Sequence, residues 1–131
     1  MEIPISPEKA LKFMLGLLVI VVLFHFSILF QIIPYNIVWA GKLNTVNEMY
    51  AFEAASIAIN LFLILILALK GHYIKHSIPE KWLNGILWFF VVVFALNTIG
   101  NLFAKTVFEK VVFTPLTLIS AIFIWIILKK K

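Results

Sequence analysis

The chain has 131 residues, of which 63% are hydrophobic and 13% are charged, and its mean hydropathy is +1.08. A soluble domain carries roughly 45–50% apolar and about 25% charged residues. The composition therefore excludes an ordinary soluble protein, a disordered tail and a nucleic-acid-binding domain. It predicts an integral membrane protein in contact with membrane lipids. The net charge of +5 comes from lysines, which in membrane proteins set topology more often than they bind polyanions.

The sequence lacks most of the residue patterns that carry chemistry. It has no cysteine, which excludes disulfides, thiol redox relays and thiolate metal sites. It also contains no phosphate-binding glycine loop, no metalloprotease helix motif and no nucleophile elbow. We therefore expect no cofactor and no metal, and the sequence favours a protein that is not an enzyme.

Four long apolar stretches follow one another along the chain. Their apolar length matches the roughly 20 residues that a spanning helix needs, and a bilayer leaves helices or closed barrels as the only spanning structures. The alternating pattern of a barrel strand is absent. We expect helices at about residues 8–33, 47–70, 79–104 and 111–128. Because the connections are short, residues 1–131 form one all-α domain, an up-down-up-down four-helix bundle.

Local signals mark the predicted helix ends. Ser6, Pro7 and Glu8 are typical of a helix start, with serine as the cap and proline in the first turn. Pro34 ends the first helix, and Asn47 with Glu48 begins the second. Gly71 ends the second helix.

The lysines favour one orientation in the membrane. Eight lie on the side of the two termini and the middle connection, against three on the other side, namely Lys42, Lys105 and Lys110. The positive-inside rule places both termini in the cytoplasm. The preference for Lys, Ile, Asn and Phe is typical of an AT-rich bacterial genome, so we expect the bacterial cytoplasmic membrane.

Polar residues within the predicted spans gather in the half of the bilayer away from the termini. Glu53 and Asn60 share one face of the second helix, because they lie seven positions apart. The third helix carries Asn97, Asn101 and Lys105, and the first helix carries Gln31. We expect these side chains to line an outward-facing polar pocket above an apolar plug.

Glu53 has two interpretations. Ionisable residues inside a membrane are costly and usually face a partner within the bundle. Glu53 is either a proton- or cation-responsive carboxylate in a binding pocket, with Lys105 as its counter-ion, or half of a buried clamp that fixes helix register. His25 is predicted to hydrogen-bond a neighbouring helix, and the alternative is a proton relay. Trp39 belongs to the interfacial aromatic belt or to a lid over the pocket.

Small residues form a second face on the second helix. Ala51, Ala55 and Ala58 recur at helical spacing, and small residues let helices approach closely. This face meets another helix of the bundle, a second copy in a homodimer, or another membrane subunit.

Two strings resemble known sequences. Residues 33–42 (IPYNIVWAGK) and 96–105 (LNTIGNLFAK) are similar to a group of small four-span bacterial integral membrane proteins. The resemblance implies the four-span fold and brings no activity, substrate or site with it. Chain length and span count also resemble the small multidrug transporters, but only in architecture, because their membrane-embedded glutamate lies in the first helix.

Three functions stay open from the sequence. The leading hypothesis is a protein that binds or transports a small ligand or ion through the polar pocket. The second is a structural or accessory subunit whose polar residues hold helices together. The third is a lipid-processing enzyme, which would require His25 and Glu53 within reach of one substrate position.

Overall fold

The computed structural model describes residues 5–32, 45–103, 107 and 109–129. These residues form four long helices: α1 (Pro7–Leu29), α2 (Val46–Lys70), α3 (Glu80–Leu102) and α4 (Thr114–Leu128), with a π-helical segment η3 (Glu109–Phe113) directly before α4. All four spans, the last counted from Lys110, are long and apolar enough to cross a membrane. The all-helical fold and the four candidate membrane spans agree with the sequence prediction.

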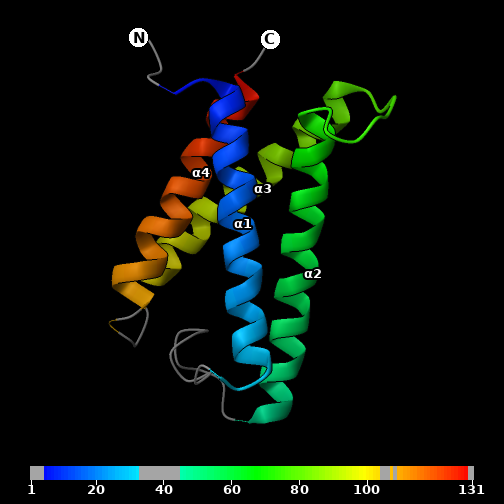
Figure 1. The fold of residues 1–131 in the computed structure, drawn as a ribbon. Helices are drawn as coiled ribbons and strands as arrows, with labels where there is room; N and C mark the ends of the chain where they lie inside the picture. The colour runs from blue at the N-terminus through cyan, green and yellow to red at the C-terminus, as the bar shows by residue number, and fades with distance from the viewer. Residues whose placement is uncertain (1–4, 33–44, 104–106, 108, 130–131) are drawn as a thin grey trace.

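Both ends of the chain and the connection between α2 and α3 lie at one end of the molecule in Figure 1. The last turn of α1 and the first turn of α2 lie at the opposite end. We call the half nearer the termini the terminal half, and the other the distal half.

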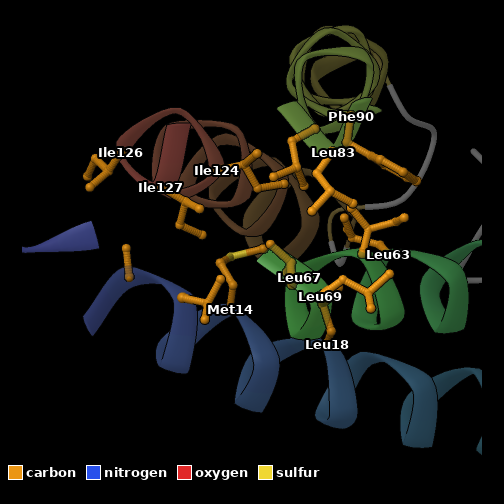
Figure 2. Close-up of a cluster of buried hydrophobic side chains, with 14 residues drawn as sticks. Met14, Leu18, Leu63, Leu67, Leu69, Leu83, Phe90, Ile124, Ile126 and Ile127 are labelled. Carbon is orange, nitrogen blue, oxygen red and sulfur yellow. The ribbon is translucent and has the colours of Figure 1, made fainter. Parts of the chain in front are cut away.

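The hydrophobic core fills the terminal half. Met14 and Leu18 of α1 pack with Leu63 and Leu67 of α2, and Figure 2 shows these side chains meeting others from α3 and α4. The buried residues of α3 are Leu83, Leu87 and Phe90, all from the first half of that helix. The predicted apolar plug is therefore present in the terminal half.

The start of α1 is as predicted, but its end is not. Ser6 Oγ accepts a hydrogen bond from the backbone N–H of Lys9 at 3.2 Å, and Pro7 occupies the first turn. The helix ends at Leu29 rather than at residue 33. Gln31 takes a left-handed conformation (φ 61°), and the N–H of Ile32 donates to the carbonyl of Ser27 at 2.8 Å. This Schellman motif closes the helix before Pro34 is reached.

Helix α2 is capped by Thr45, not by Asn47. Thr45 Oγ1 accepts from the N–H of Glu48 at 3.1 Å and lies 3.3 Å from the Glu48 carboxylate. The sequence placed the start of this helix at Asn47, and the structure starts it one residue earlier, at Val46. At the far end, the helix ends at Gly71 as predicted, and the left-handed residue is the next one, His72 (φ 61°). A Cβ at Gly71 would overlap Leu11 Cδ2, so the Leu11 side chain would have to shift.

Three further helix boundaries differ from the prediction. Helix α3 begins at Glu80, one residue after the predicted start, and ends at Leu102, two residues before the predicted end. The fourth span opens with the π-helical η3 rather than with regular α-helix. Pro115 has no N–H, and its ring would clash with the carbonyl of Val111 in an α-helix. A wider turn before the proline avoids that clash.

Candidate functional site

The packing of α1 against α2 brings together two ionisable side chains that are distant in sequence. His25 Nδ1 lies 2.5 Å from Glu53 Oε2. Glu53 is completely buried, and the His25 side chain is 17% exposed. His25 lies one turn before the end of α1, and Glu53 lies about 10 Å along α2 from its start, at 1.5 Å per residue. The pair therefore occupies the distal half, within the apolar spans.

Aromatic rings lie close to the pair. The Phe24 ring contacts the His25 imidazole edge-on at 5.8 Å between centroids, and it contacts Phe113 of η3 at 5.5 Å. On the α2 side, Ser56 is buried one turn beyond Glu53. The apolar rings beside the pair strengthen an electrostatic hydrogen bond relative to water.

With Glu53 ionised, the contact assigns the proton between the two side chains to Nδ1 of His25. A carboxylate accepts hydrogen bonds, so Nδ1–H donates to Glu53. A carboxylate that holds Nδ1 in this way fixes the imidazole orientation. No hydrogen bond to Nε2 is found among the described residues. The arrangement suits proton binding or ligand contact at Nε2.

The prediction that His25 hydrogen-bonds a neighbouring helix is confirmed, and its partner is Glu53. The sequence had instead suggested Lys105 as the partner of Glu53. Lys105 and Trp39 both lie outside the described residues. The proximity that the enzyme hypothesis required, His25 beside Glu53, is present.

The other predicted site residues make separate contacts. Asn60 is half-buried and donates to the Ser56 carbonyl of its own helix at 2.7 Å. Gln31 is exposed and donates to Tyr50 Oη at 3.4 Å. Asn97 is exposed and Asn101 is half-buried, and neither forms a side-chain hydrogen bond with a described residue. Of the predicted site residues, His25 is the one that a described hydrogen bond places against Glu53.

A threonine pair joins α3 and α4 in the distal half. Thr98 Oγ1 lies 2.9 Å from Thr117 Oγ1, and each also lies within hydrogen-bond distance of a carbonyl one turn earlier, so one hydroxyl donates across the interface while the other donates to its carbonyl. Nearby in sequence, Thr114 Oγ1 is buried without a hydrogen-bond partner among the described residues. The pair holds α3 to α4 much as the His25–Glu53 pair holds α1 to α2.

Sequence reasoning missed a second ionic cluster, at the terminal end. Lys70 is only 4% exposed, and its Nζ donates to Glu80 Oε2 at 2.6 Å and to Asn84 Oδ1 at 2.7 Å. Lys70 was interpreted only as a topology lysine. The one available signal was the four-residue spacing of Glu80 and Asn84, which places a carboxylate and an amide on one face of α3.

The two histidines of the α2–α3 connection do not form a metal site. His76 Nε2 donates to the Leu69 carbonyl at 2.6 Å, and its Nδ1 accepts from the N–H of Ile78 at 2.9 Å. Both nitrogens are therefore engaged. In the part of the chain that the structure describes, no cluster of three or more His, Asp or Glu residues could hold a metal.

Two cavities lie in the terminal half. One of about 370 Å³ lies between α2 and α3, and one of about 200 Å³ lies between the ends of α1, α2 and α4. Neither is lined by Glu53 or His25. The outward-facing pocket predicted from the sequence corresponds to neither of them.

Comparison with known proteins adds no relative. No family model, no curated protein and no solved structure matches the chain.

Proposed function

We propose that this chain is a multi-pass protein of the bacterial cytoplasmic membrane that binds or moves a small ion, with His25 and Glu53 as one ionisable unit. The single observation behind this proposal is the 2.5 Å contact between His25 Nδ1 and the buried Glu53 carboxylate. Ionisable groups within a membrane are costly and are typical of ion pathways and proton relays. An imidazole–carboxylate pair can take up and release a proton, so we propose the proton as the ion.

The proposed topology is up-down-up-down, with both termini in the cytoplasm. Eight lysines belong to the side of the termini and the α2–α3 connection, against three on the other side. One of the eight, Lys70, is neutralised by Glu80, which still leaves a majority of seven. The His25–Glu53 pair then lies in the half of the membrane that faces away from the cytoplasm.

The proposal is tested by proton uptake into proteoliposomes. The protein is reconstituted into vesicles that contain a pH-sensitive dye, and a potassium diffusion potential drives protons inward. Uptake by wild type is expected to exceed that of protein-free vesicles several-fold. It is expected to fall to the protein-free rate in His25→Gln and in Glu53→Gln.

Thr98→Val is the matched control, because it removes an interhelical hydrogen bond in the same half of the molecule without removing an ionisable group. It should retain wild-type uptake. Equal uptake by all four proteins, or an equal loss in Thr98→Val, would contradict the proposal. Circular dichroism and gel filtration establish that each variant is folded.

The second candidate function, a structural or accessory subunit, is favoured by a different observation. Several polar side chains of the spans bond to carbonyls of their own helix: Ser27, Asn60, Thr98, Thr117 and Ser120. Ala51, Ala55 and Ala58 are also exposed along α2, which leaves a face open for a partner helix. This candidate predicts a stable homodimer or a fixed co-purifying protein that Ala55→Leu disrupts.

A further inference from the structure

A groove lies where α2 and α3 separate. In the terminal half the two helices meet through buried leucines and through the rings of Phe62 and Phe90, whose centroids are 6.3 Å apart. Beside this contact is the cavity of about 370 Å³. Its lining consists of four residues from the apolar part of the spans and two from the start of α3, namely Phe62, Gly85, Ile86, Phe89, Lys81 and Trp82.

The lining changes from charged to apolar along α3. Lys81, Gly85 and Phe89 follow one another at steps of four residues and therefore share one helix face. Lys81 lies in the first turn, at the level expected for lipid headgroups in the proposed orientation. Phe89 lies two turns deeper.

Gly85 lies in the lining of this depression, which is open to the surface. A Cβ added at Gly85 would meet no atom within 4 Å, so the space above the glycine is open. The rings of Phe62 and Phe89 are 45% and 64% exposed. An acyl chain fits this space, because it is apolar and is bounded by large rings.

Two hydrogen-bond donors, Lys81 and Trp82, line the end of the groove nearest the start of α3. Lys81 is exposed, and it forms no ion pair with a described residue; its neighbour Glu80 is bound to Lys70 instead. Trp82 is 63% exposed, and its indole N–H is a hydrogen-bond donor. An ammonium and an indole N–H suit a phosphate, and lysines near the cytoplasmic leaflet attract anionic lipids.

We infer that this groove binds one anionic phospholipid of the cytoplasmic leaflet. The headgroup phosphate contacts Lys81 and Trp82, and one acyl chain lies over Gly85 between Phe62 and Phe89. The inference depends on the proposed membrane orientation. It is independent of the His25–Glu53 pair, so either can fail without the other.

The experiment uses Trp82 as the reporter. The other three tryptophans are replaced by phenylalanine (Trp39→Phe, Trp88→Phe and Trp125→Phe), and this protein is reconstituted with brominated lipids, which quench indole fluorescence on contact. Brominated phosphatidylglycerol is compared with brominated phosphatidylcholine at equal mole fractions. We expect phosphatidylglycerol to bind about fivefold more tightly, the preference that one lysine gives at a membrane surface.

Two substitutions separate the headgroup from the chain. Lys81→Gln should abolish the preference for phosphatidylglycerol, whereas Lys75→Gln, which changes an exposed lysine outside the groove, should keep it. Gly85→Leu should reduce quenching by both lipids because it fills the depression. Gly100→Leu is its control on the same helix, since Gly100 is also free of neighbours.

Four results would overturn the inference. Equal quenching by the two lipids would show that no headgroup is selected. An equal loss of preference in Lys75→Gln would show diffuse attraction to the basic end of the molecule. Unchanged quenching in Gly85→Leu would show that no acyl chain occupies the groove. Shielding of Trp82 from the brominated lipids by a second copy of the protein would show the same.

Discussion

Glu53 is fully buried between α1 and α2, and its carboxylate is held by His25. Burying a carboxylate is costly, and a partner offsets that cost only when the geometry is good. Replacing both members of such a pair by apolar residues is often nearly neutral, whereas removing one leaves the other poorly solvated. The energetic signature of the pair is therefore strong coupling.

His25→Phe alone is expected to lower the free energy of unfolding by about 2–3 kcal/mol, because it removes the imidazole from a buried carboxylate. The double variant His25→Phe/Glu53→Leu should lie within about 1 kcal/mol of wild type. Unfolding in mixed detergent micelles gives the four values of the cycle. The Thr98–Thr117 pair, cycled with valine, should couple by only about 0.6 kcal/mol. Additive losses at His25 and Glu53 would show that the two side chains do not interact.

Two glycines should respond in opposite directions to alanine. Gly71→Ala is expected to destabilise the protein by about 1–2 kcal/mol, since the new Cβ overlaps the buried side chain of Leu11. Gly85→Ala should stabilise α3 by up to about 1 kcal/mol, because its Cβ meets nothing and alanine is the better helix former. Thermal unfolding in detergent compares the two. If Gly71→Ala is neutral, Leu11 moves aside without cost.

Single polar residues were easier to predict than their partners. Glu53 and His25 were singled out because ionisable groups are rare in apolar spans. Their pairing was missed because it depends on how α1 rotates against α2, which helical spacing within one chain segment does not fix. Lys70 was missed for a related reason: its partners Glu80 and Asn84 lie beyond a connection, on another helix.

At the scale of the helix, the predicted and the observed structures differ mainly at the helix ends. Apolar length predicted all four helices, and the cap at Ser6 was correct. The end of α1 was wrong, because a Schellman motif with glutamine in the left-handed position has almost no sequence signature. The η3 segment was also missed. Pro115 lies in the first turns of the predicted fourth helix, where a proline costs little, so the sequence did not indicate that the turn before it would widen.

The cap of α2 provides a direct test at this scale. Thr45→Ala should lower the free energy of unfolding by about 1 kcal/mol, because the N–H of Glu48 loses its acceptor. Asn47→Ala should have little effect, since Asn47 is exposed in the first turn. Chemical unfolding of the two variants decides between these residues. A larger loss in Asn47→Ala would contradict the assignment of Thr45 as the cap.

At the scale of the whole molecule, the two halves differ in how the helices hold together. The terminal half is packed with leucine, isoleucine and methionine from all four helices (Figure 2). In the distal half, polar contacts join α1 to α2 and α3 to α4. This division follows the sequence, in which polar span residues gather away from the termini.

The proposed orientation is tested with single cysteines, because the natural chain contains none. Asn47→Cys and Ser77→Cys place a thiol at an exposed position at opposite ends of the molecule. In intact bacterial spheroplasts, a membrane-impermeant maleimide should label Asn47→Cys at once. It should label Ser77→Cys only after the membrane is permeabilised. The reverse labelling pattern would show the opposite topology, with the His25–Glu53 pair on the cytoplasmic side.

The central claim is that His25 and Glu53 act as one ionisable unit within the membrane. It is tested most directly by the ¹⁵N signals of the His25 side chain in lipid bilayers, assigned with His25→Gln. We predict a protonated Nδ1 whose signal moves in Glu53→Gln. The signal should stay in place in Glu80→Gln, which alters a carboxylate beside His72 at the other end of the molecule. A His25 signal that is the same in wild type and Glu53→Gln would contradict the account.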